Sequence, residues 1–135
     1  MDGRLIAFAP ACDKTPYFIT DSVTTIGDYA FSYCTELIDV AIPNSVTSIG
    51  SHAFSHCSWL TSIAIPDSVT SIGDYAFYWC HSLKVVWCWP TTPPSGGSYM
   101  FDGNASGRKI FVPGASVSAY RSASHWSAYA DAIVR

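Results

Sequence analysis

The chain carries little charge for its length. Of 135 residues, seven are Lys or Arg and ten are Asp or Glu, so 13% are charged, about half of the roughly 25% found in average proteins. Apolar residues make up 49% and aromatic residues 15%, a composition that excludes intrinsic disorder. The net charge of −3 and the lack of any basic cluster beyond Arg108-Lys109 exclude the positive surface that nucleic-acid binding requires. We therefore predict one folded domain, residues 1–135, that does not bind nucleic acid.

Long hydrophobic runs are also missing. No stretch approaches the roughly 20 apolar residues that a membrane-spanning helix needs, so we expect no membrane insertion. The first twelve residues, MDGRLIAFAPAC, contain an apolar stretch that is short and interrupted by Pro10, and they do not make a good signal peptide. The location of the protein is therefore unknown from the chain itself.

The common catalytic and metal-binding motifs are absent as well. The sequence has no G-x-S-x-G elbow, no phosphate-binding loop, no H-E-x-x-H and no C-x-x-C pair. Without such a motif we expect no enzymatic activity, no catalytic residues, no cofactor and no metal site.

What the chain does have is internal repetition. Three blocks of 23 residues, 18–40, 41–63 and 64–86, align without gaps, and ten columns are identical in all three. Seven of these columns hold Ile (Ile19, Ile42 and Ile65), Ser, Val, Thr, Gly, Ala and Leu. The other three are expected to form buried ladders of Ile26, Ile49 and Ile72, of Phe31, Phe54 and Phe77, and of Cys34, Cys57 and Cys80.

Each block reads as the same local structure. The third begins with a short strand from Leu60 to Ile65, and Pro66-Asp67-Ser68 turns the chain into a second extended piece that ends at Gly73. Asp74 and its equivalents, Asp28 and Ser51, are expected to cap a single helical turn. One unit cannot bury its own Phe, Ile and Leu, but units stacked at about 4.8 Å would align them in ladders. The pattern therefore predicts a solenoid.

The pattern I-P-x-S-V-T-S-I-G-x-x-A-F-x-x-C-x-x-L resembles the BspA-type leucine-rich repeat of bacterial surface proteins, and the tail after residue 90 is similar to the cap that closes such arrays. The first block departs from it, with Thr20 where the others have Pro43 and Pro66. The resemblance implies a right-handed leucine-rich repeat solenoid of mainly short strands with one short α or 3-10 turn per repeat. It also implies a noncatalytic, adhesin-like module that binds a protein ligand and lies on the bacterial cell surface or is secreted.

The C-terminal segment, residues 87–135, is predicted to be a small α/β cap. We expect Trp87-Cys88-Trp89-Pro90 to form the last strand of the main ladder, with Cys88 in the position of Ile65. Met100-Phe101 would fill the place of the next Ala-Phe pair, and Lys109 to Val112 would add one more strand. A helical pattern from Ser116 follows, and its apolar residues are expected to cover the open end: Val117, Tyr120, Trp126, Tyr129, Ala130 and Ile133.

The N-terminal segment, residues 1–17, is shorter than the C-terminal one. It offers one strand from Arg4 to Ala9 and a loop from Pro10 to Pro16, which is little chain to cover the first layer of Phe, Ile and Leu. We therefore predict end-to-end self-association through the N-terminal face.

The cysteines and histidines allow more than one interpretation. Five cysteines could include a disulfide between stacked units or a metal site, but a buried column of thiols is explained by packing alone. His52 and His56 are four residues apart and could chelate a metal on one helix face. Because the equivalent positions in the other blocks carry Tyr or Trp, we interpret both as members of exposed ring-bearing columns.

The columns that vary between blocks give the candidate binding residues. Large rings accumulate there towards the third block, and rings on a rigid scaffold make good interface anchors. We predict a protein-binding surface made of Trp59, Trp79, Tyr78, His56, Tyr33, Trp87 and Trp89. Two alternatives remain open: a structural spacer or fragment of a larger bacterial surface protein, and carbohydrate binding through the exposed aromatic rings.

Overall fold

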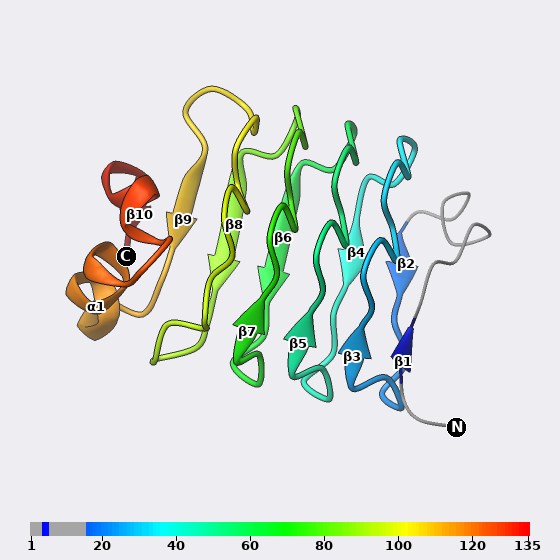
Figure 1. The fold of residues 1–135 in the computed structure, drawn as a ribbon, viewed down its shortest axis with the longest axis horizontal. Helices are drawn as coiled ribbons and strands as arrows, with labels where there is room; N and C mark the ends of the chain where they lie inside the picture. The colour runs from blue at the N-terminus through cyan, green and yellow to red at the C-terminus, as the bar shows by residue number, and fades with distance from the viewer. Residues whose placement is uncertain (1–3, 6–15) are drawn as a thin grey trace.

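The computed structural model describes residues 4–5 and 16–135. Its strands are two to four residues long and stand side by side in two layers along the long axis of the molecule, with the N- and C-terminal ends at opposite ends of that axis (Figure 1). One layer is a sheet in the order β1-β3-β5-β7, and the other contains β2-β4 and β10-β9-β8-β6. The first layer consists of β1 Arg4–Leu5, β3 Thr25–Ile26, β5 Ser48–Ile49 and β7 Ser71–Ile72. The second consists of β2 Tyr17–Phe18, β4 Val40–Ala41, β6 Ser62–Ile65, β8 Val85–Cys88, β9 Lys109–Phe111 and β10 Ile133–Val134.

Strand pairing follows the 23-residue period. Ile26 pairs with Ile49 and Ile49 with Ile72, all in parallel register. In the second layer Ile65 pairs with Cys88, the register that the sequence predicts. The next step is one residue longer, because Trp87 pairs with Phe111 and Ser71 bridges Ser95. The chain is thus a repeat fold of short parallel strands, and a fourth coil follows the three blocks.

Stacked rings form the centre of the core. The rings of Phe31 and Phe54 are stacked with centroids 5.0 Å apart, those of Phe54 and Phe77 at 5.2 Å, and those of Phe77 and Phe101 at 5.4 Å. All four side chains are fully buried. Burying one such ring contributes roughly 2–3 kcal/mol, and no single coil has the depth to bury it. Met100 is buried beside Phe101, so this pair occupies the predicted position in the fourth coil.

The predicted helical turn in each repeat is wrong. Residues 28–33 form successive turns instead, and Tyr29 and Tyr33 have positive φ angles of 62°. The reason lies in the hydrogen bonds: the Tyr29, Phe31 and Tyr33 N–H groups donate to carbonyls of the next coil at 2.7–3.0 Å. Ladder bonds between coils thus take the donors that a helix would use. The short helices of the described chain lie instead in the C-terminal segment.

Two of the predicted helix caps, Asp28 and Asp74, also form hydrogen bonds between coils. The Asp28 carboxylate accepts a hydrogen bond from the Ser51 N–H at 2.8 Å, and Asp74 accepts one from the Ser98 N–H at 2.8 Å. Each carboxylate therefore holds the following coil and does not cap a helix of its own.

The C-terminal segment closes one end of the array. It contains η2 Gly114–Ser116, α1 Val117–Ser122 and η3 Ser127–Ala132, grouped at one end of the molecule (Figure 1). Tyr120, Trp126, Tyr129 and Ile133 are buried, whereas Val117 and Ala130 are only partly buried. The Trp126 Nε1–H group donates to the Pro94 carbonyl at 2.8 Å, which ties the segment to the fourth coil.

The strand predicted at Trp87-Cys88-Trp89-Pro90 is observed as β8, which ends at Cys88. It is not the last in its sheet, and the further strand predicted from Lys109 is found as β9. β8 pairs with β9, and β9 pairs with β10, because the apolar alternation of Ile110 and Ile133 repeats that of Val86. At the other end, β1 pairs with β3 and accounts for Arg4 and Leu5 of the predicted strand. The rest of that strand and the loop that follows lie outside the described residues except for Pro16.

Candidate binding surfaces

Aromatic rings dominate the exposed apolar surface. Among the described residues nine large hydrophobic side chains are exposed, and eight of them are aromatic. Four of the five tryptophans belong to this group, with exposed fractions from 38% to 60%, and only Trp126 is buried. Tryptophan is normally well covered in a folded protein, so the surface rings need a separate explanation.

The first group of rings lies on the turns. We define the turn-side cluster as Tyr33, His56, Tyr75, Tyr78 and Trp79. His56 stacks on Tyr33 with centroids 4.3 Å apart and meets the Tyr78 edge at 5.8 Å. Tyr78 in turn contacts Tyr75 at 5.1 Å and Trp79 at 5.8 Å. Four of the predicted binding residues are therefore connected through ring contacts.

The backbone explains how these rings reach the surface. Tyr33, His56, Tyr75 and Trp79 all have φ near 60°, a conformation that costs a residue with a side chain roughly 1–2 kcal/mol. Ring stacking between successive coils offsets part of that cost.

The surroundings of His56 also change its titration. Desolvation by burial lowers the pKa of His56 below its usual value, and the nearby His81 and His52 lower it further.

Trp79 has a structural contact in addition to its exposed surface. A Cβ added to Gly103 would lie 2.3 Å from a carbon of the Trp79 ring, so the ring packs closely against this turn. Trp79 therefore contacts the fourth coil and is still 41% exposed.

The second group of rings lies on the strands. We define the strand-face cluster as Trp87, Trp89 and Phe111, on β8, directly after β8, and on β9. The Trp87 ring stacks on Phe111 with centroids 4.6 Å apart and lies nearly parallel to Trp89 at 5.9 Å. Trp87 and Trp89 were predicted from the sequence, and Phe111 was missed. Two sequence signals could have identified Phe111. It lies on the strand predicted from Lys109, and Trp87 lies on the strand predicted one coil earlier.

Trp59 belongs to neither cluster. Its side chain is 60% exposed, and no ring contact of Trp59 is found among the described residues. A third set of rings forms an outer stack of Tyr29, His52, Tyr75 and Tyr99 with centroid distances of 4.7, 4.8 and 5.4 Å. The sequence predicts a column of rings at the first three positions, and only Tyr99 was missed. The extra residue before Ser95 hides Tyr99 from a strict 23-residue alignment.

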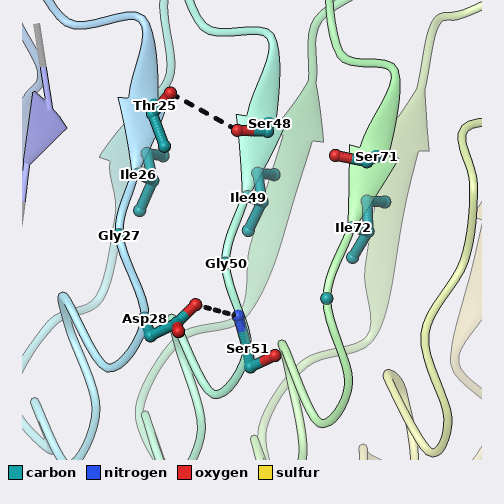
Figure 2. A pocket seen from close by; sticks show the side chains of 11 residues that line it. Thr25, Ile26, Gly27, Asp28, Ser48, Ile49, Gly50, Ser51, Ser71 and Ile72 are labelled. Carbon is teal, nitrogen blue, oxygen red and sulfur yellow. Dashed lines mark hydrogen bonds between the residues drawn. The ribbon is translucent and has the colours of Figure 1, made fainter.

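A groove on the first layer is lined by hydroxyl-bearing side chains and has no aromatic rings. It runs across β3, β5 and β7, and Figure 2 shows the hydroxyls of Thr25, Ser48 and Ser71 in a row along it. Ser48 Oγ donates to Thr25 Oγ1 at 3.5 Å, while the Asp28 carboxylate is held by the Ser51 N–H. No imidazole or thiol lines this groove, and Asp28 is its one titratable side chain.

The free thiols among the described residues are buried and do not line the groove. Cys57, Cys80 and Cys88 are free and buried, and their neighbours explain their positions: Cys57 and Cys80 donate to the carbonyls of Phe31 and Phe54 at 3.1 and 3.0 Å. The Cys80 thiol and burial raise the pKa of Cys57, and burial raises the pKa of Cys88 to about 12.

Cys34 differs from the other members of its column. It is disulfide-bonded, with a partner outside the described residues, so the interpretation of Cys34 as a free packing thiol is wrong. Its column is nevertheless fully buried, and Cys34 itself is 1% exposed. Within the described part of the chain, no group of three or more His, Cys, Asp or Glu side chains could hold a metal ion.

One structural finding and two comparisons with known proteins bear on identity. Across residues 4–5 and 16–135, no helix has the length and apolar character needed to cross a membrane. A search of curated proteins finds no match to this chain. A family model described as "BspA type Leucine rich repeat region (6 copies)" matches residues 6–126, which is most of the chain and includes the three blocks, the fourth coil and part of the C-terminal segment. The chain belongs to the BspA-type leucine-rich repeat family.

Proposed function

We propose that the protein is a noncatalytic module that binds another protein through its exposed rings. The observation that supports this most directly is the exposure of Trp59, Trp79, Trp87 and Trp89 on a scaffold whose coils are fixed by ladder hydrogen bonds. Trp and Tyr contribute most often to the binding energy of protein interfaces. The family is generally noncatalytic and typically consists of protein-binding surface proteins.

The architecture proposed for this role is a single right-handed solenoid over residues 1–135. In this division residues 1–17 are an N-terminal strand and loop segment, the blocks 18–40, 41–63 and 64–86 are the array, and residues 87–135 are the fourth coil and cap. Parallel pairing at offsets of 23 and 24 residues supports this division.

A location on the bacterial surface or outside the cell, with an adhesin-like role, is part of the proposal. Members of the family are typically found on bacterial surfaces. The disulfide at Cys34 is consistent with this, because disulfides persist in oxidising compartments.

The test uses a double variant, Trp59→Ala with Trp79→Ala, measured by surface plasmon resonance against arrays of immobilised extracellular proteins and of glycans. We expect saturable binding to at least one protein and at least tenfold weaker binding by the double variant, with the circular dichroism spectrum unchanged. Phe18→Ala, which removes a 69% exposed ring at the other end of the array, is the control. Unchanged binding by the folded double variant would contradict a role for these rings, and binding to glycans alone would favour the carbohydrate alternative. A chain that binds neither array would favour the spacer role.

We also propose end-to-end self-association through the N-terminal face. The exposed ring of Phe18, on β2 at that end of the array, supports this. Light scattering at increasing concentration should give a mass above 14.6 kDa, and a constant monomer mass would contradict it.

A further inference from the structure

A hollow lies on the second layer, the one that contains β4, β6 and β8, beside the strand-face cluster. Six residues from three successive coils line it: Ile42, Asn44, Ala64, Pro66, Asp67 and Trp89. Ala64 pairs with Trp87, so an alanine methyl lies beside an indole in the same outward row. This step from a small to a large side chain leaves room in front of Ala64, and Trp89 forms the wall on the side of the next coil.

The walls of this hollow combine an aromatic ring with an uncompensated carboxylate. Trp89 is 48% exposed, and Asp67 and Asn44 are exposed beside it. Asp67 forms no hydrogen bond or ion pair with any residue that the structure describes, and it also lines a second hollow with the loop Pro90 to Pro94. Its carboxylate therefore remains available to a ligand approaching from outside.

The charge distribution along the chain favours a cation at this place. Residues 16–83 contain six carboxylates and no Lys or Arg: Asp21, Asp28, Glu36, Asp39, Asp67 and Asp74. Residues 84–135 contain five Lys or Arg and two Asp. The three blocks, residues 18–86, thus carry formal charge −5 and the C-terminal segment, residues 87–135, carries +2. The field around the blocks attracts positive groups within a Debye length of roughly 8–10 Å.

We propose that this hollow binds an arginine side chain of the partner protein. The guanidinium plane stacks on the exposed Trp89 ring, and its N–H groups donate to the Asp67 carboxylate and the Asn44 side-chain oxygen. The inference rests on the proposed protein-binding function and adds the chemistry that the partner must carry.

Arginine fits these walls better than the other candidates do. Its guanidinium is flat and weakly hydrated, so it can stack on a ring while it donates to a carboxylate in a bidentate manner. Lysine carries a compact charge that does not match a flat ring face in this way. A sugar could stack on Trp89 and donate hydroxyl hydrogen bonds to Asp67 as well, but a neutral sugar has no charge for the field of the array to attract.

The strand-face cluster extends the site. Trp87 is 38% exposed and stacks on Phe111, which provides an apolar surface next to the hollow. A partner segment with an apolar residue near its arginine would contact both surfaces, and a single arginine alone would bind weakly.

The proposal can be tested with small probes by NMR on the full chain. Nα-acetyl-arginine amide is titrated against ¹⁵N-labelled protein, and its neutral isostere, Nα-acetyl-citrulline amide, is the comparison. We expect saturable shifts of the Trp89 indole N–H, at least fivefold weaker binding of the citrulline compound, and smaller shifts at the Trp59 indole N–H. Trp89→Phe assigns the indole signal.

Two charge-neutralising variants make the test specific. Asp67→Asn is expected to weaken binding of the arginine compound at least threefold, whereas Glu36→Gln, which removes the same charge from an exposed position in the first block, should leave it within twofold. Equal effects of both variants, equal binding of citrulline, or shifts produced only by a neutral oligosaccharide such as cellohexaose would each overturn the proposal. Backbone spectra of each variant establish that the fold is retained.

The outcomes also separate this site from the proposed function. Arginine binding at Trp89 without any bound protein on the array would leave the site standing and contradict the protein-binding role. Conversely, if the chain binds a protein and Asp67→Asn does not weaken that binding, the protein-binding role is supported and the arginine site is contradicted.

Discussion

Gly50 and Gly73 lie where the backbones of successive coils approach each other closely. A Cβ on Gly50 would lie 2.5 Å from the Asp28 carboxylate and 2.7 Å from the Asp28 backbone nitrogen, and one on Gly73 would lie 2.5 Å from the Ser51 nitrogen. Neither residue is among the glycines with positive φ. Close backbone approach, and not a positive φ angle, is therefore the reason for glycine at these two positions.

Gly50→Ala should consequently lower the free energy of unfolding by about 1–3 kcal/mol, because the coils must separate to admit the methyl group. Gly114→Ala is the matched control, since its Cβ would meet nothing closer than 3.5 Å and should change stability by no more than about 0.5 kcal/mol. Urea unfolding monitored by circular dichroism measures both. Equal stability of the two variants would show that the approach at Gly50 is not limiting.

The buried thiol of Cys88 gives a prediction of pH dependence. Burial raises its pKa to about 12 in the folded protein, whereas the ordinary value is 9.0. Between these values the folded state retains a proton that the unfolded state loses, so the contribution of Cys88 to stability falls as pH rises from about 9 to about 12.

The thiolate is the reactive form, so native Cys88 should resist iodoacetamide at pH 9 and react once urea unfolds the chain. Mass spectrometry of the digested protein, which reads each cysteine separately, measures this. Rapid alkylation of Cys88 in the native protein would contradict the burial that the structure shows.

Single residues show where sequence reasoning succeeds and where it stops. The columns of Ile26, Phe31 and Ala30 repeat without change, and repetition identifies them as buried without any knowledge of the coil. The surface rings vary, and no pattern in the sequence tells Trp79, which contacts Gly103, from Trp59, which has no such support. That difference depends on the position of the fourth coil, which has an inserted residue.

At the level of the elements, the Phe ladder connects all four coils. Phe54 stacks on both neighbours, Phe31 and Phe77, and is fully buried. Phe54→Ala should therefore destabilise the protein by about 3–5 kcal/mol, since the cavity opens between two rigid coils and cannot collapse.

The control for this prediction is Tyr29→Ala, which removes a 54% exposed ring from one end of the outer stack. Its expected cost is below about 1 kcal/mol, because such a ring loses little on truncation. Chemical denaturation gives both values, and similar midpoints for the two variants would show that the ladder does not carry the stability assigned to it.

The turn elements show why one local prediction was wrong. Asp28 followed by Tyr-Ala-Phe resembles a capped helix start, and a single sequence gives no sign that the N–H groups of alternate residues will donate to the neighbouring coil. The left-handed conformation of Tyr29 and Tyr33 is stabilised by those bonds and by ring stacking. Long-range pairing has thus overridden local propensity.

For the whole molecule, the repeat period predicts most of the architecture, and the two ends are harder. The period identifies the coils because each coil buries its apolar face only against the next. β10 was not predicted, because the return from η3 to the sheet depends on how Tyr120, Trp126 and Tyr129 pack together. The charge separation between array and C-terminal segment is visible in the sequence but acquires meaning only once Asp67 and Trp89 are seen to share a hollow.

The C-terminal segment should determine how stability is distributed along the array. Trp126 is fully buried, contacts the rings of Phe101 and Tyr120 at 5.8 and 4.9 Å, and donates to Pro94. Trp126→Ala should cost about 3–5 kcal/mol, whereas Trp59→Ala, the same change at an exposed position, should cost less than about 1 kcal/mol.

Hydrogen exchange of Trp126→Ala should then show a gradient. In an array stabilised by contacts between neighbouring coils, loss of one end weakens the adjacent coil most. Protection should fall most at Phe101 and the fourth coil, less over residues 64–86 and least over residues 18–40. If protection falls equally at every coil, the array unfolds as one cooperative unit, and the stability of each coil does not depend on its distance from the C-terminal segment.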